Sequence, residues 1–195
     1  MAIIFSGYEE VANTEHIVFE SSLLKATISG HLWDARIQGT VNGQVVDINC
    51  DNGVAVKMGA FTHDGLQERL ATVAGVKDKV GIVGSVALIK DAYNQAQAAE
   101  TNFYNKAGQL AKVYELSGDI YDPDVFGVSR MAFSSADNTI VVGNYVVLDG
   151  NGGYVAQTAK PNMSNFGFVG QIHSIKVGTF YTLVRIAVLQ NVDNN

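Results

Sequence analysis

Residues 37–50 read IQGTVNGQVVDINC, in which Asn42-Gly43 separates two stretches rich in Val, Thr and Ile. An Asn-Gly pair between such stretches is the strongest short-range signal for a β-hairpin, because these two residues readily form the tight turn that joins its strands. The sequence therefore predicts two antiparallel strands that meet at Asn42-Gly43.

Further short runs of strand-forming residues follow along the chain. Twenty glycines against two prolines fit tight turns between short strands better than they fit a helical bundle. Strands separated by turns about every eight to twelve residues are typical of a β-sandwich or β-barrel. The other predicted strands are Val54–Met58, Thr139–Leu148, Tyr154–Thr158, Gly167–Ile175 and Tyr181–Leu189.

One segment departs from this strand pattern. Residues 88–103, LIKDAYNQAQAAETNF, are rich in Ala, Gln and Glu and contain neither Gly nor Pro. Their apolar positions recur at steps of three and four, which predicts a helix with a narrow apolar stripe. We expect the stripe to pack on a sheet; association with a second copy of the helix is the alternative.

The sequence GIVGSVALI at residues 81–89 is similar to GFVGQIHSI at residues 167–175. The similarity extends upstream in both places, with one inserted residue. The aligned ranges are 53–59 with 143–149 and 68–89 with 153–175. Each unit predicts a buried strand whose two glycines either bulge it or admit a neighbouring backbone. Duplication of a β-module is the favoured interpretation, and chance similarity between Val- and Gly-rich strands is the alternative.

The predicted fold is mainly β with one α-helix. It consists of two similar small β-modules, barrel-like or sandwich-like, that are joined by a helix and preceded by an N-terminal arm. We expect residues 1–36 to form the arm and the first strands, 37–104 to form the first β-module with its helix at 88–103, and 105–195 to form the C-terminal β-module. A chain of 195 residues is long enough to bury a core in each.

Composition argues against two classes of partner. Thirteen Lys and Arg against nineteen Asp and Glu give a net charge of −6, without any basic run, so nucleic acid is not an expected partner. No stretch reaches the length of about 18 apolar residues that a transmembrane helix needs, so no membrane contact is expected. The opening MAIIFSGYEEV lacks the features of a signal peptide, and we expect synthesis in a cytoplasm.

The reactive residue types are not arranged for chemistry. Cys50 ends a predicted strand and is expected to be a small buried residue. The four histidines lack the spacing of metal ligands, and His31–Asp34 is expected to be packing around a lone aromatic residue rather than a functional cluster. The histidines are His16, His31, His63 and His173. We therefore expect no catalytic, cofactor or metal site.

Acidic and glycine-rich stretches give the same answer. Asp119, Asp122 and Asp124 surround a proline and predict an acidic surface turn, without the spacing of an EF-hand calcium loop. The glycines of residues 150–153 lie in a predicted hairpin turn and lack the phosphate-binding pattern that precedes a helix. No sequence feature therefore favours an enzyme.

Residues 103–119, FYNKAGQLAKVYELSGD, resemble a segment of the auxiliary structural proteins of tailed bacteriophages. The resemblance extends to FSGYEEVANTEHIV at residues 5–18, to the GIVGS strand, and to the closing module from VGNYVVL to VRIAVL. Capsid decoration, or cement, proteins of this group are small β-rich modules that bind the outside of the head as oligomers. The resemblance implies the same role here, on the outer capsid surface, with no catalytic residue.

The resemblance also implies the partners. These are the major capsid protein and further copies of the chain itself, with a trimer favoured among homo-oligomers. Residues 1–17 are predicted to be an arm laid on a capsid subunit, and an edge strand of the first module is the alternative. The predicted capsid or subunit contacts, in this arm and in the loops 62–65 and 160–166, are Phe5, Tyr8, Glu9, His63, Asp64, Asn162, Met163 and Phe166.

Two other functions remain open at this point. A host-attachment or carbohydrate-binding module is the alternative, because a β-rich fold with exposed aromatic residues such as Trp33, Tyr121 and Tyr154 would permit sugar binding. An enzyme would require a deep pocket with convergent polar groups.

Overall fold

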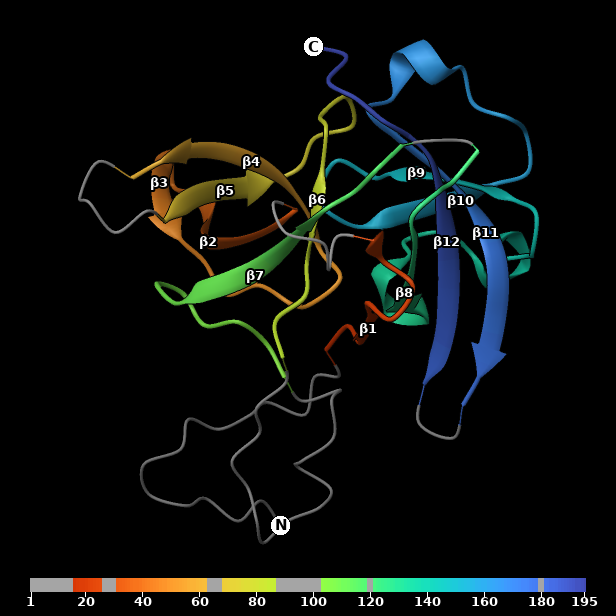
Figure 1. The fold of residues 1–195 in the computed structure, drawn as a ribbon, viewed down its shortest axis with the longest axis horizontal. Coiled ribbons are helices and arrows are strands. Elements are labelled where there is room, and N and C mark those ends of the chain that lie inside the picture. The colour runs from red at the N-terminus through yellow and green to blue at the C-terminus, as the bar shows by residue number, and fades with distance from the viewer. Residues whose placement is uncertain (1–15, 26–30, 63–67, 87–102, 119–120, 179–180) are drawn as a thin grey trace, which may run out of the picture.

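The fold is that of a computed structural model, which describes residues 16–25, 31–62, 68–86, 103–118, 121–178 and 181–195. Strands form two six-stranded sheets, so the prediction of a mainly β protein is confirmed (Figure 1). The described residues contain no α-helix. They contain short 3-10 helices, among them η3 (Arg130–Ala132), η4 (Asp137–Thr139) and η5 (Met163–Asn165).

The predicted helix at residues 88–103 has no support. Residues 88–102 lie outside the described residues, and Phe103 is not helical. The joining helix of the predicted architecture therefore stays without an observed counterpart.

The first sheet closes into a five-stranded barrel. Its strands, in order around the barrel, are β2 (Leu32–Val41), β5 (Arg69–Val73), β4 (Ala55–Phe61), β6 (Gly81–Val83) and β7 (Leu110–Glu115). β2 closes the ring because it pairs in parallel with β5 along one edge and antiparallel with β7 along the other. Hydrophobic alternation along these short strands explains why one face of each is buried inside the barrel.

The hairpin predicted at Asn42-Gly43 is present. β3 (Gln44–Asp47) pairs antiparallel with the end of β2, and Val41 lies opposite Gln44 across the turn. Asn42 and Gly43 have φ values of 51° and 77°, the left-handed conformation that a two-residue type I′ turn requires of both. The Asn-Gly pair therefore predicted this turn correctly. β3 pairs with the end of β2 and is not one of the five barrel strands.

The second sheet contains the strands of the C-terminal half together with one short strand from the beginning of the chain. Its strands, in order across the sheet, are β1 (Phe19–Glu20), β8 (Val125–Ser129), β12 (Thr182–Asn191), β11 (Phe168–Val177), β9 (Tyr145–Leu148) and β10 (Tyr154–Gln157). A single parallel bridge joins Phe133, just beyond β8, to Tyr154 in β10.

Both sheets contain the same succession of strands. β4 pairs antiparallel with β5 on one edge and with β6 on the other. β9 pairs antiparallel in the same way with β10 and with β11. β7 follows in the first sheet and pairs with β6 and with β2. β12 follows in the second sheet and pairs with β11 and with β8. The parallel β2–β5 ladder thus corresponds to the single parallel bridge between Phe133 and Tyr154. This order agrees with the sequence alignment of 53–59 with 143–149 and of 68–89 with 153–175.

The registers of the two units differ. Val146 of β9 lies opposite both Ala156 and Gly170, whereas the corresponding contacts of β4 are made by different residues. Val56, which aligns with Val146, lies opposite Val73 and Gly81. The β2–β5 ladder closes the barrel, whereas a single bridge joins the corresponding segments of the second sheet.

The sheets do not follow the predicted boundaries at 36/37 and 104/105. β2 crosses residue 36, and β1, which precedes it, pairs with β8 in the second sheet. β7 at residues 110–115 was expected in the C-terminal module, but it completes the first barrel. The physical reason is that β2 and β6 would otherwise leave unpaired edges, which β7 covers from both sides.

The larger hydrophobic core lies between the barrel and the second sheet. Alternate residues of β4 and β6 serve different cores: Val56 and Val83 face into the barrel, while Ala55 and Ile82 face the second sheet. Opposite them, the rings of Phe126, Tyr154 and Phe168 pack with centroids 6.0–6.2 Å apart. The two sheets therefore share one packed interior.

Tyr154 ties this aromatic cluster to the barrel. Its ring is fully buried, and its hydroxyl donates a 2.8 Å hydrogen bond to the carbonyl oxygen of Gly53. We expect Tyr154→Phe to lower the free energy of unfolding by about 1.5 kcal/mol, because the Gly53 carbonyl would lose its buried partner. Urea denaturation measures this change. Tyr145→Phe, in the preceding strand, is the matched control, and an equal effect of both variants would contradict the assignment.

The glycines of the repeated Gly-X-Val-Gly element admit neighbouring groups, as predicted. A Cβ on Gly167 would lie well under 3.0 Å from the carbonyl oxygens of Lys77 and Asp78 in the barrel. A Cβ on Gly84 would meet the ring of Phe19 in β1. The register shift between Val169 and Gly170 marks the predicted bulge. Gly84 and Gly167 are thus points of close approach between the barrel and the second sheet, whereas Gly81 and Gly170 admit neighbours from their own sheets.

Candidate interaction site

Most of the predicted contact residues lie outside the described residues. Phe5, Tyr8 and Glu9 belong to residues 1–15, and His63 and Asp64 belong to residues 63–67. The predicted N-terminal arm falls almost entirely in the first of these ranges. These five assignments therefore stay predictions.

The other three predicted contacts lie together in the loop before β11. Asn162 is exposed, and its side-chain oxygen accepts a 3.3 Å hydrogen bond from the backbone N–H of Ser164. Met163 and Phe166 are half-buried, and both their carbonyl oxygens accept hydrogen bonds from the side-chain amides of Gln190 and Asn194. The loop is therefore held in place by the C-terminal strand and its continuation.

Asp78 is a hydrogen-bond acceptor for three separate parts of the chain near this loop. Its carboxylate accepts hydrogen bonds from Lys57 Nζ at 2.6 Å, from the N–H of Gly75 at 2.8 Å and from Asn195 Nδ2 at 2.7 Å. Burial alone would raise the pKa of Asp78, but these donors outweigh it and lower the pKa below 3.8. The ionised carboxylate is therefore part of the folded structure.

A second carboxylate joins strands at the other side of the second sheet. Glu20 in β1 accepts two hydrogen bonds from Arg185 in β12, at 2.7 and 2.8 Å. These bonds and the charge of Arg185 hold the pKa of Glu20 below 4.5, against the opposing effect of burial. The short strand β1 is thus fixed to the sheet by a bidentate ion pair as well as by its ladder.

We expect the protein to lose stability in acid. Glu20 and Asp78 have lowered pKa values in the folded state, so their ionised carboxylates stabilise the fold at pH values above their unfolded pKa values of 4.5 and 3.8. This contribution is lost as the pH falls through the folded pKa values and the carboxylates become protonated. The free energy of unfolding, measured by urea denaturation, should therefore fall between about pH 5 and pH 3. The double variant Glu20→Gln, Asp78→Asn should be less stable at neutral pH but flatter over this range. Asp122→Asn, at a mostly exposed carboxylate, should keep the wild-type slope; a wild-type slope in the double variant would contradict the assignment.

Cys50 and Asp124, two residues considered for chemistry, have structural roles. Burial raises the pKa of Cys50 to about 12, so this thiol is a packed residue, as predicted, and a poor nucleophile. Asp124 was expected in an acidic surface turn, but it is 1% exposed, and its carboxylate accepts hydrogen bonds from the backbone N–H groups of Lys25 and Ser117. That part of the prediction is wrong, because the backbone of two neighbouring segments needs this buried acceptor.

No group of three or more His, Cys, Asp or Glu side chains suited to a metal ion occurs within the described ranges. His16 instead pairs with Asp51, with 2.7 Å between Nδ1 and Oδ1, and stacks on Tyr104. Among the helices of those ranges, none has the length and apolar character needed to cross a bilayer.

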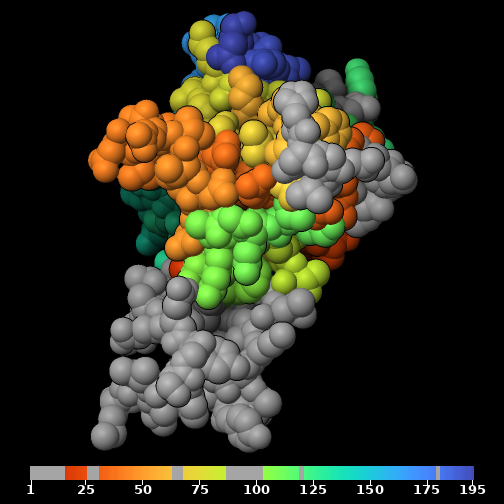
Figure 2. Space-filling model, turned by 90° about the vertical axis from the view of Figure 1, so that its left-hand side faces the viewer, coloured from red at the N-terminus to blue at the C-terminus, as the bar shows by residue number. Residues whose placement is uncertain are grey.

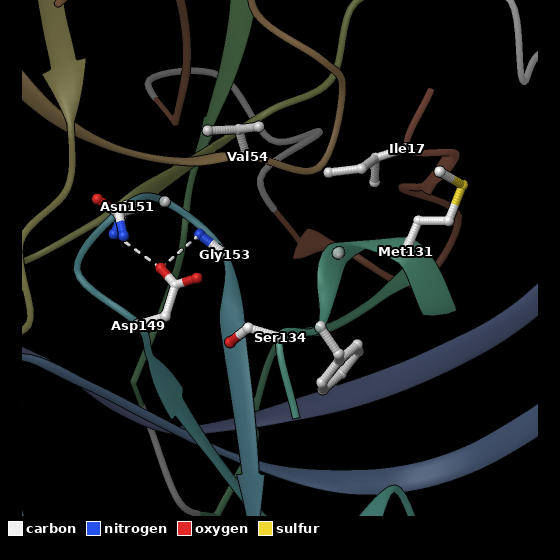
Figure 3. Close-up of a pocket in the computed structure, with 10 residues that line it drawn as sticks. Ile17, Val54, Met131, Ser134, Asp149, Asn151 and Gly153 are labelled. Atoms are coloured by element: carbon white, nitrogen blue, oxygen red, sulfur yellow. Dashed lines mark hydrogen bonds between the residues drawn. The ribbon is translucent and has the colours of Figure 1, made fainter. Parts of the chain in front are cut away.

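A shallow hollow of about 210 Å³ lies where the barrel meets the second sheet (Figure 3). Apolar side chains of Ile17, Val54 and Met131 line one side of it. The Asp149 carboxylate at the opposite side accepts hydrogen bonds from the backbone N–H groups of Asn151 and Gly153, at 2.7 and 3.0 Å, and so holds its own turn. The hollow is smaller than the roughly 300–1,000 Å³ of typical ligand pockets.

The aromatic residues proposed for sugar binding have different environments. Tyr154 is fully buried in the core, so the expectation that it is exposed is wrong. Its ring is needed between Phe126 and Phe168, which explains the burial. Tyr121 is 91% exposed, and Trp33 is half-buried.

A cluster of Trp33, Phe61 and Arg69 at one mouth of the barrel, here called the mouth cluster, combines exposed aromatic surface with a positive charge. The Arg69 guanidinium lies 4.8 Å from the centre of the Trp33 ring and 5.1 Å from that of Phe61. Sequence reasoning favoured packing for Trp33, with sugar binding as an alternative role, and missed the other two residues. The available signal was alternation, because Trp33 and Arg69 each stand two residues before a small buried residue, Ala35 or Ala71.

Comparison with known proteins found no matching protein family, no matching curated protein and no matching solved structure. The function is therefore inferred from the fold, the surface and the sequence resemblance.

Proposed function

We propose that this chain is a structural virion protein that binds the outside of a tailed-phage head and stabilises the capsid as a decoration, or cement, protein. The major capsid protein would be its partner, and it would act as a homo-oligomer, with a trimer favoured. The sequence resemblance of residues 103–119 and of the closing module supports this role.

One structural observation supports a docking role. Apolar side chains remain exposed on the barrel strands, on β3 and at the ends of these strands. They are Leu32, Val41, Val45, Val46, Phe61 and Leu110. Exposed apolar groups on a rigid scaffold are what a docking surface needs.

Stabilisation would follow from selective binding. A protein that binds the assembled lattice better than its separated subunits shifts the equilibrium towards the assembled shell. Several contacts from one oligomer would raise the apparent affinity through effective concentration. Neither step requires a covalent change in this chain or in its partner.

The test uses heads that are built from a tailed-phage major capsid protein and lack this chain. Purified protein is added, unbound protein is removed, and the heads are imaged by electron cryomicroscopy. We expect ordered additional density on the outer surface, whose symmetry gives the oligomeric state. Saturating protein that leaves the heads unchanged would overturn the proposal.

A carbohydrate-binding or host-attachment module is the second candidate. The exposed Tyr121 and the half-exposed Trp33 are the observations that favour it, because aromatic faces stack on sugar rings. This function predicts retention on cell-wall glycans. Binding to heads without any retention on glycans would exclude it as the main role.

A further inference from the structure

The mouth cluster is assembled from three strands of the barrel. Trp33 comes from β2, Phe61 ends β4 and Arg69 begins β5. The two rings are 6.1 Å apart and meet edge to face at 73°, and the guanidinium of Arg69 lies against both. Cation–π contacts of this kind hold an arginine in one orientation.

Strand alternation explains why these side chains close the barrel. Ala35 and Ile37 face the barrel core, so Trp33, on the same face of β2, lies at the end of that core. Arg69 has the same relation to Ala71 in β5. The end of β4 and the start of β5 lie on the side of the barrel remote from the second sheet (Figure 1). Figure 2 views the molecule from this side, where residues of the barrel strands form the middle of the surface.

Arg69 differs from the other three arginines of the chain in lacking a carboxylate partner among the described residues. Arg36 pairs with Glu68, Arg130 with Asp137 and Arg185 with Glu20. These three pairs occupy the guanidinium groups. The interactions of Arg69 with described residues are its two ring contacts and one 3.1 Å hydrogen bond from Nε to the carbonyl oxygen of Gly59. Its terminal nitrogens are therefore available for a ligand.

The carboxylates around the mouth cluster are already neutralised by other cations. Glu115, which accepts a 3.4 Å hydrogen bond from the Trp33 indole, pairs with Lys79 at 2.7 Å. Asp34, the neighbour of Trp33, pairs with Lys112 at 2.6 Å. No carboxylate of the described residues therefore compensates the charge of Arg69, which lies beside a Phe61 ring that is 48% exposed.

We propose that the mouth cluster is a docking point for a carboxylate of the partner's surface, an Asp or Glu side chain next to an apolar residue. This inference rests on the proposed function, in which the partner is the capsid lattice. The terminal nitrogens of Arg69 match a carboxylate in a bidentate arrangement, and Trp33 and Phe61 accept the adjoining apolar group. Trp and Arg are also the residue types that most often dominate binding energy at interfaces.

The first experiment needs no capsid. Trp33 is the one tryptophan of the chain, so its fluorescence reports directly on the mouth cluster. N-acetyl-leucine offers a carboxylate beside an apolar side chain, and N-acetylleucinamide is the same molecule without the charge. We expect a saturable change in Trp33 fluorescence with the acid, with affinity at least about tenfold weaker for the amide. Equal responses to the acid and the amide would overturn the inference.

Variants test whether the change in Trp33 fluorescence depends on Arg69. Arg69→Gln should abolish the preference for the acid, and Arg69→Lys, which keeps the charge but loses the planar fork, should retain only part of it. Arg130→Gln removes an arginine already paired with Asp137 and should behave like wild type. Far-ultraviolet circular dichroism of each variant shows whether it is folded. A stronger response to chitooligosaccharides that persists in Arg69→Gln would identify a sugar site instead and overturn the carboxylate assignment.

The second experiment measures affinity for heads that lack the chain. Arg69→Gln should bind about 30-fold more weakly than wild type, while Arg130→Gln should bind as wild type does. Wild-type affinity of Arg69→Gln would overturn this inference and leave the proposed function standing. If the wild-type protein responded to the acid but did not bind heads, the proposed function would fall together with the capsid as the partner.

Discussion

Replacing Gly167 with alanine is expected to lower the free energy of unfolding by about 3 kcal/mol or more. The new Cβ would meet the carbonyl oxygens of Lys77 and Asp78, which belong to backbone and cannot rotate away. Relief would require the barrel loop and β11 to separate. Urea denaturation followed by circular dichroism measures the loss.

Both main-chain groups of Gly167 strengthen this expectation. Its N–H donates to the carbonyl oxygen of Val76, and its carbonyl oxygen accepts from the N–H of Val192, both at 2.9 Å. A displacement of Gly167 would therefore strain two hydrogen bonds that join the barrel loop to the C-terminal strand region. The steric clash of the new Cβ and the strain on these two hydrogen bonds therefore both occur at Gly167.

The matched control is Gly143→Ala. Gly143 has a φ of 92°, and no atom lies within 4 Å of the position that its Cβ would take. Alanine there should cost about 1 kcal/mol through backbone strain alone. If both variants lost the same stability, close packing at Gly167 would not be the reason for its glycine.

Local patterns in the sequence predicted local structure well. Asn42-Gly43 required nothing beyond its neighbours to specify the turn, and the repeated Gly-X-Val-Gly marked two strands that are closely approached by other segments. Alternation also located several core strands, because a strand with one buried face shows it in every second residue. In such cases the physical determinant lies within a few residues. The strand predicted at Thr139–Leu148 is present only at Tyr145–Leu148.

The failures concern pairings between distant segments. Nothing near residues 110–115 shows that β7 will close a barrel begun by β2, and nothing near Phe19 shows that β1 will join β8. Tyr154 shows the same limit, since an aromatic residue beside a turn has no local mark of burial. Its burial depends on Phe126 and Phe168, which lie elsewhere in the chain.

The mouth cluster was missed for a related reason. Trp33 and Arg69 are separated by 36 residues (69 − 33) and are brought together by the parallel pairing of β2 and β5. Arg69 is also noticeable only by contrast with the three paired arginines, and this contrast requires the ion pairs among the described residues. Charge counts and motifs cannot supply that contrast.

Asn191→Ala is expected to lower the free energy of unfolding by about 3 kcal/mol. The side chain is buried and makes three hydrogen bonds to barrel backbone: its oxygen accepts from the Val80 N–H, and its nitrogen donates to the carbonyl oxygens of Val80 and Leu116. Alanine would leave all three groups buried without partners. Asn165→Ala, at an exposed asparagine, is the control and should change stability by less than about 0.5 kcal/mol.

A second substitution separates the hydrogen bonds from mere side-chain volume. Asn191→Asp keeps the size and the acceptor for the Val80 N–H, but it sets a carboxylate oxygen against the carbonyl oxygens of Val80 and Leu116. We expect a loss at neutral pH at least as large as that of alanine, because the buried charge faces two acceptors. The difference from wild type should shrink as pH falls, since a protonated carboxyl can donate again. Urea denaturation over a pH series measures it, and near-wild-type stability of Asn191→Asp at pH 7 would show that these donor bonds do not hold the barrel to the second sheet.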